Sequence, residues 1–250
     1  MLSTRFLRFI QFRVVKRIAC LKLMRHKQLW QELINYRNKT KSSGCSYSDY
    51  WELYNAIRVR KPKEILECGP GVSTLVMSYA LLENEKEGFP GRITAMEELE
   101  TYYKMAVELL PEYLHSYVEF ILSPRIEDYY SLFRGVRYRD VPDRPYDFVF
   151  VDGPNLFAPS DESLTFDFDY IHVVRNSEKP VYGIVDDRLS TSHVFQVVFG
   201  MDKVKFSAIH ELAFVGPCTK DDLTPLELAH LATVFLKNAK LFGNTEIKLR

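Results

Sequence analysis

One short stretch, Lys63-Glu-Ile-Leu-Glu-Cys-Gly-Pro-Gly-Val-Ser-Thr74, constrains the fold most, because it joins an apolar strand-like run to a helical run through two glycines. Gly69 and Gly71 allow a tight turn, and they let a ligand approach the backbone because no Cβ stands in the way. Ser73 or Thr74 is expected to cap the helix, whose N-terminal N–H groups face the same space. The pattern is typical of an open α/β sheet that binds a nucleotide-like ligand beyond its strand ends.

The spacing differs from the dinucleotide fingerprint, which requires a third glycine where this chain has Thr74. Glu67, two residues before Gly69, would repel a pyrophosphate but suits a ligand with a cationic amino group. At this point the chain resembles the class I S-adenosylmethionine (SAM)-dependent methyltransferases, whose first motif reads acid-x-Gly-x-Gly. A tight turn without a ligand is the alternative interpretation.

Three later apolar runs also end in acids. The run that begins at Arg92 ends at Glu97 and Glu98, where a carboxylate can accept the ribose hydroxyls, and Glu97 fits better than Glu98. The run 146–152 ends at Asp152, and the run 180–187 ends at Asp186 and Asp187. Clustered carboxylates are costly unless a ligand or a cation offsets their repulsion. The residues expected to bind SAM are Glu67, Gly69, Gly71, Ser73, Thr74, Glu97, Glu98 and Asp152.

Strand and helix signals alternate along the middle of the chain, which predicts an α/β fold with a doubly wound, mostly parallel sheet. The resemblance implies seven strands, with an antiparallel hairpin at the sheet edge, and it covers roughly residues 50–217. The expected strands are 64–67, 92–97, 117–122, 147–152, 181–185, 203–209 and 211–215. The expected helices are 50–57, 72–86, 100–110, 126–134, 162–175, 190–199 and 224–236.

Three segments are expected: a basic helical extension with its linker (1–45), the SAM-binding domain (46–218) and a C-terminal helical extension (219–250). The 46% apolar content is enough to fill a substantial core, and the net charge is zero. Residues 1–31 nevertheless carry eight Lys and Arg residues and no acid. The remainder is therefore acidic, which argues against a specific nucleic-acid partner.

The basic extension has three possible roles. Its apolar residues could pack on the domain or on a second subunit as a homodimer, it could lie on an anionic membrane surface, or it could be a targeting segment. Apolar residues occupy too much of its circumference for a clean two-faced helix, so partial burial is expected. The four cysteines lack metal-ligand spacing and indicate free thiols in a reducing, cytoplasmic compartment. The membrane-surface role of the basic extension would place the protein at a membrane periphery.

Methyl transfer to a hydroxyl needs an acceptor for its proton, and a divalent cation can lower the pKa of that hydroxyl. Asp152, Asp186 and Asp187 form a hard-oxygen set suited to Mg²⁺. The set is similar to that of the metal-dependent catechol-type O-methyltransferases, but the position of their catalytic lysine holds Asn155. His193 and His172 are the candidate replacements for that lysine. The expected catalytic residues are Asp152, Asp187 and His193. Helix capping by the Asp186-Asp187 pair is the structural alternative.

A long loop, 155–169, leaves the same edge, and its Phe157, Phe166 and Phe168 suit a sugar or polyol; a simple lid is the other interpretation. The sequence thus predicts a SAM-dependent transferase that methylates a hydroxyl of a small molecule or a glycan, with Mg²⁺ as a possible second cofactor. The alternative is a catalytically silent scaffold, SAM-binding or ligand-free, that docks to a membrane or a partner through its basic N-terminus.

Overall fold

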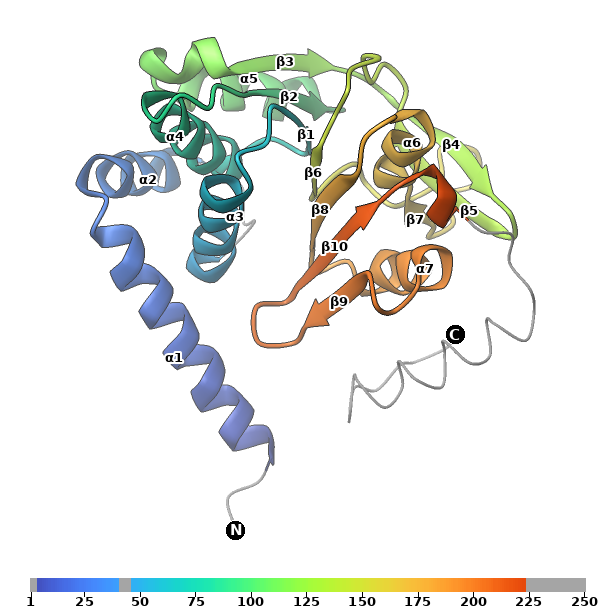
Figure 1. Cartoon of the computed structure of the whole chain (residues 1–250), viewed down its shortest axis with the longest axis horizontal. Coiled ribbons are helices and arrows are strands. Elements are labelled where there is room, and N and C mark those ends of the chain that lie inside the picture. The colour runs from blue at the N-terminus through green and yellow to red at the C-terminus, as the bar shows by residue number, and fades with distance from the viewer. Residues whose placement is uncertain (1–3, 41–45, 224–250) are drawn as a thin grey trace.

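A seven-stranded sheet forms the centre of the computed structural model, which describes residues 4–40 and 46–223 (Figure 1). Its strands lie in the order β3 (Val118–Leu122), β2 (Arg92–Glu97), β1 (Glu64–Cys68), β6 (Phe148–Val151), β8 (Val181–Asp186), β10 (Leu212–Cys218), β9 (Val204–Ser207). β10 runs opposite to the other six strands, so its pairings with β8 and β9 are antiparallel and the remaining pairings in this sheet are parallel. The predicted mostly parallel sheet with an antiparallel edge hairpin is therefore confirmed.

Helices cover both faces of this sheet (Figure 1). They are α1 (Thr4–Met24), α2 (Lys27–Lys39), α3 (Tyr47–Arg60), α4 (Val72–Lys86), α5 (Glu100–Leu109), α6 (Asp169–Asn176) and α7 (Leu189–Phe199), with short 3₁₀ turns at Glu112–Tyr117 and Lys220–Asp222. Alternate strand residues face opposite layers, as a pleated strand requires. Ile65 and Phe150 pack with α2, α3 and α4, whereas Leu66 and Val151 pack with α6 and α7.

The strand register brings the predicted acids to one edge of the sheet. Cys68 lies opposite both Met96 and Val151, and Val151 lies opposite Val185. The next residue or two on each strand, including Glu97, Asp152 and Asp186, therefore lie side by side at the carboxyl ends of four adjacent parallel strands. This is where open α/β sheets bind their ligands.

The N-terminal helices belong to the packed body of the protein. Leu23, Leu29 and Leu33 have no exposed surface and share one core cluster with α3 and α4. Partial burial of the basic extension is thus confirmed. The predicted helix 224–236 lies outside the described residues.

The predicted helix at 126–134 is wrong, because the segment forms a β-hairpin of β4 (Arg125–Tyr130) and β5 (Phe133–Tyr138). Tyr130 pairs with Phe133, so the turn has only two residues, and Ser131 adopts a positive φ of 51°. Gly135 then allows Phe168 to pack directly on the hairpin, since a Cβ there would be 2.5 Å from the ring. β7 (Phe166–Asp167) adds a third strand, so the helix expected at 162–175 begins only at Asp169.

Candidate functional site

The two glycines of the turn after β1 have different structural roles. Gly69 has a φ of +89°, and a Cβ on it would lie 3.0 Å from the backbone nitrogen of Gly153. It is therefore required for the turn and for close packing against the loop after β6. Gly71 is the N-cap of α4, has an extended φ of −178°, and a Cβ on it would meet nothing within 4 Å. Any residue can adopt this extended φ, and the side chain of a residue substituted for Gly71 would project into open space.

Glu67 is fully buried beneath this turn and does not face open space. Its carboxylate accepts hydrogen bonds from the hydroxyls of Ser73, at 2.6 Å, and Thr74, at 2.7 Å. Thr74 also accepts the Gly71 N–H at 2.9 Å, so neither hydroxyl residue is the N-cap that we expected. Burial raises the pKa of Glu67 to about 8. These three side chains therefore fix the turn from inside, and direct contact of Glu67 with a cofactor amino group does not match this geometry.

A cavity of about 160 Å³ lies on the open side of the turn. Glu97 lines it at the end of β2, with Asp152 at the end of β6. Glu97 Oε1 accepts the N–H groups of Glu98 and Leu99, each at 2.8 Å, which leaves Oε2 without a hydrogen bond to the described residues. Burial, followed by the charges of Glu98 and Asp152, raises the pKa of Glu97 above its usual range. Its free oxygen suits the ribose role predicted for this position.

Glu98, the second candidate for the ribose contact, is directed elsewhere. It forms an ion pair with Arg125 at the start of β4, and its Oε1 accepts the Asn155 N–H at 2.8 Å. It does not line the cavity. The structure therefore separates the two neighbouring acids, with Glu97 at the cavity and Glu98 in an anchor for the loop after β6.

Asp152 and Asp186 lie together at the ends of adjacent strands and share a side-chain hydrogen bond. Burial, the Asp152 charge and the Asp49 charge together raise the pKa of Asp186 to about 8. A pair of neighbouring carboxyl groups holds one proton readily, because two negative charges repel at this distance. The pair therefore holds a shared proton to a higher pH than an isolated carboxyl group would.

Asp187 and His193 do not form a metal-ligand set with Asp152 and Asp186. Asp187 is exposed, has a positive φ of 27°, and donates its N–H to the Glu211 carbonyl at 2.9 Å. His193 lies one turn into α7, and burial lowers its pKa. Within residues 4–40 and 46–223, no group of three or more His, Cys, Asp or Glu side chains is arranged to hold a metal ion. The Mg²⁺ site predicted at Asp152, Asp186 and Asp187 is therefore not supported, and neither Asp caps α7, whose N-cap is Arg188.

Several residues at this site had no sequence signal. Tyr36 and Thr40, on and just after α2, line the cavity opposite the glycine turn. Arg188 donates to the carbonyls of Asp152 and Pro154, the latter at 2.8 Å, and so holds the loop after β6. Asp49, in the first turn of α3, contributes charge to the carboxyl cluster.

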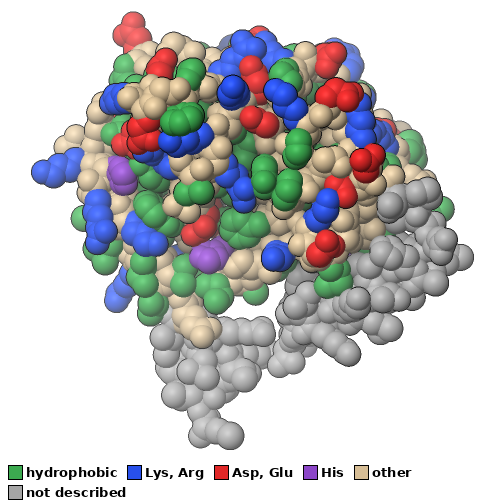
Figure 2. Space-filling model, viewed as in Figure 1, with side chains coloured by type: hydrophobic (Ala, Val, Ile, Leu, Met, Phe, Trp, Pro, Cys, Tyr) green, Lys and Arg blue, Asp and Glu red, His purple; other side chains and the backbone are tan. Residues whose placement is uncertain are grey.

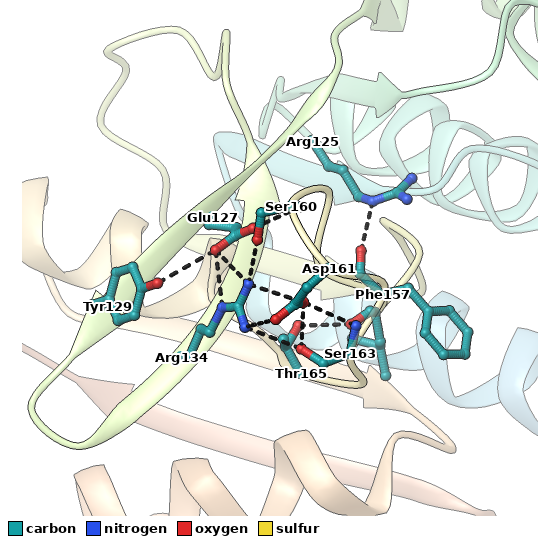
Figure 3. Close-up of polar contacts among 10 residues, drawn as sticks. Arg125, Glu127, Tyr129, Arg134, Phe157, Ser160, Asp161, Ser163 and Thr165 are labelled. Atoms are coloured by element: carbon teal, nitrogen blue, oxygen red, sulfur yellow. Dashed lines mark hydrogen bonds and ion pairs between the residues drawn. The ribbon is translucent and has the colours of Figure 1, made fainter.

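The loop 155–165 is held firmly by the β4–β5 hairpin (Figure 3). Arg134 on β5 donates to Asp161 at 2.8 and 3.1 Å and to Ser160 at 2.6 Å, and it pairs with Glu127 at 2.8 Å. Arg125 donates to the Phe157 carbonyl at 2.9 Å.

The three aromatic residues suggested for sugar contacts are not equivalent. Phe168 is fully buried against the hairpin, and Phe166 packs edge-on against Phe133 with ring centroids 5.6 Å apart. Phe157 is the one that remains 46% exposed.

No protein-family model and no curated protein matches the chain. Among solved structures, the chain is similar to a precorrin-6y C5,15-methyltransferase from Geobacter metallireducens GS-15, with 15% identity, a TM-score of 0.42, and coverage of 70% of this chain and 90% of that one. The strand order and direction are those of a doubly wound, Rossmann-like α/β sheet that ends in an antiparallel hairpin.

Proposed function

We propose that this protein is a SAM-dependent methyltransferase that methylates a hydroxyl group of a small molecule or a glycan. The cavity at the carboxyl ends of β1, β2 and β6 carries the proposal. Gly71 lines it without a Cβ, and Glu97, which also lines it, keeps one carboxylate oxygen without a hydrogen bond to the described residues. These are the two features by which a Rossmann-like site accommodates an adenosine-containing ligand.

The cavity residues suggest how SAM would be held. Glu97 would accept the ribose hydroxyls, the Gly69–Gly71 turn would approach the methionine part, and Tyr36 would close the opposite side. When bound, SAM supplies an electrophilic methyl group, and the protein contributes orientation and exclusion of water.

The Asp152–Asp186 pair is the proposed proton acceptor. Asp186 keeps its proton at neutral pH and, through its hydrogen bond, holds the Asp152 carboxylate in one orientation. Asp152 can then accept the proton from an acceptor hydroxyl as methyl transfer proceeds. Arg188 fixes the backbone around Asp152 through its hydrogen bonds to the Asp152 and Pro154 carbonyls. No step through a metal ion is proposed, because the described donor set does not form a metal site.

Transfer of a labelled methyl group tests this proposal. The protein would be incubated with methyl-labelled SAM and a panel of sugars, polyols and catechols, with and without EDTA. We expect label on an acceptor oxygen at a rate that EDTA leaves unchanged. Asp152→Asn should lower that rate by roughly 10²–10⁴-fold while SAM binding remains. Binding of SAM without transfer to any hydroxyl would instead indicate a catalytically silent scaffold. Loss of activity in EDTA would show that transfer depends on a metal ion.

A further inference from the structure

Helix α1 has an inner face that is already occupied by the protein. Ala19 and Leu23 are buried against the body, where α1 contacts α2 and α3. The two cations that share this side also have partners. Burial raises the pKa of Asp49 and of Glu211, and Lys16 lies close enough for its charge to offset part of that rise in both. The Lys22 ammonium lies 4.8 Å from the ring centroid of Trp51.

A second apolar line runs along the outer face of the same helix. Val14, Ile18 and Leu21 are 47%, 47% and 61% exposed, although they belong to the most hydrophobic residue types. Their spacing of four and three residues places them above one another on one side of the helix. Met24, 46% exposed, extends the line toward its C-terminal end. α1 therefore has apolar side chains on two opposite faces, and the body of the protein covers only one of them.

Basic residues border this outer line. Arg13, Arg17 and Arg25 are exposed beside it, and residues 1–31 contain no acid at all. Among the described residues, no ion pair joins Arg17 or Arg25 to a carboxylate. Lys and Arg side chains alternate with hydrophobic ones along the lower left edge of the molecule, where α1 lies (Figure 2).

We propose that this outer face of α1 docks onto the surface of an anionic lipid bilayer. A helix with an exposed apolar line between basic residues lies in the interface, with the apolar side chains among the acyl chains and the cations at the phosphates. Nucleic acid would leave the apolar line exposed to water. A second copy of this face would bring Arg against Arg with no acid to pair them, which disfavours a symmetric dimer.

The helix lies along the membrane in this arrangement and does not cross it. Within residues 4–40 and 46–223, no helix is both long and apolar enough to span a bilayer. Since Lys16 on the inner side of α1 faces Asp49 and Glu211, docking places the carboxyl edge of the sheet about one helix diameter, roughly 10 Å, from the lipid. The docking does not depend on the proposed catalytic activity.

Flotation of the full-length protein with lipid vesicles tests the proposal, without cofactor or acceptor. Vesicles of phosphatidylcholine alone would be compared with vesicles that contain roughly 30% phosphatidylserine, at low and high salt. We expect the protein to float only with the anionic vesicles, and less at high salt. Ile18→Asp/Leu21→Asp, and separately Arg13→Glu/Arg17→Glu, should each weaken the partition by at least about tenfold.

The matched control is Val59→Asp, because Val59 is a 72% exposed apolar residue on another helix, α3. It should float like the unchanged protein. Circular dichroism and thermal midpoints should be equal for all variants, since each change is at an exposed position. Failure to float with anionic vesicles, or an equal loss in Val59→Asp, would overturn the proposal. If the protein is a dimer in solution and Ile18→Asp/Leu21→Asp dissociates it, the outer face of α1 binds a second copy of this protein and the proposal is overturned.

Discussion

At the scale of single residues, the acids at the sheet edge differ in where their carboxylate oxygens point. Glu67 points inward to two hydroxyls, Glu98 points to the loop after β6, and Glu97 points to the cavity. Asp152 and Asp186 point to one another. The side chains thus separate into those that build the turn and the loop and those that face a ligand or a reacting proton.

The first prediction concerns Glu97. Glu97→Ala should weaken SAM binding by on the order of 1–3 kcal/mol, because the ribose hydroxyls would lose a charged acceptor. Calorimetry measures this change. Glu98→Ala is the matched control, since the same residue type one position later is committed to Arg125 and Asn155, and its SAM affinity should stay within about twofold of the unchanged protein. Equal losses in both variants would contradict the assignment.

The second prediction concerns the pH dependence of turnover. The pKa of Asp186 is raised to about 8, so Asp186 is protonated below that pH and ionises above it. Turnover should therefore decline as the pH rises through about 8, because Asp152 loses the hydrogen bond that orients it. Asp186→Asn keeps a donor at every pH, so this variant should stay active and lose the alkaline decline. A pH–rate profile of both proteins decides the matter; an unchanged decline in Asp186→Asn would assign it to another group.

At the scale of elements, the β4–β5 hairpin and the loop 155–165 behave as one unit, because Arg134 joins them. Arg134→Ala should therefore increase amide hydrogen exchange in residues 156–165, and we expect slower turnover with little change in SAM affinity. The matched control is Arg139→Ala, since Arg139 pairs with its neighbour Asp140. Exchange in the loop that is as slow in Arg134→Ala as in the control would contradict this role.

The elements of the parallel sheet were predictable from the sequence because their apolar runs are local and end at glycine or acid. The helix 72–86 and the strand 92–97 occur at the predicted bounds. The β4–β5 hairpin could not be predicted from the sequence, because Arg125–Tyr138 mixes charged and aromatic residues and has no glycine or proline in its turn. The same limit applies to the site. Gly69, Gly71, Glu97 and the aspartates carry local signals, whereas Tyr36, Asp49 and Arg188 reach it only through tertiary packing.

At the scale of the whole molecule, α2 is both part of the core and one wall of the candidate site. Leu33 is fully buried in the cluster shared with α3 and α4, while Tyr36, one turn later, lines the cavity. The segment before residue 46 therefore cannot be removed without exposing apolar surface. The residues that line the candidate site come from both sides of the boundary predicted between residues 45 and 46.

Leu33→Ala should accordingly lower the free energy of unfolding by roughly 2–5 kcal/mol, the usual cost of a core cavity. Urea denaturation measures it. The control is Gln31→Ala on the exposed side of the same helix, which should change the stability by less than about 0.5 kcal/mol. A similar small change in Leu33→Ala would mean that α2 is not packed as described.

Calorimetric titration of SAM and its demethylated product into the unchanged protein and into Gly71→Val tests the central claim most directly. Gly71 has an extended backbone that valine can adopt, and its Cβ would point into open space, so the variant should fold normally. We predict binding of both ligands to the unchanged protein and its loss in Gly71→Val, because the valine side chain would occupy the cavity. Absence of binding to the folded, unchanged protein, or equal affinity in Gly71→Val, would contradict a SAM site at this turn.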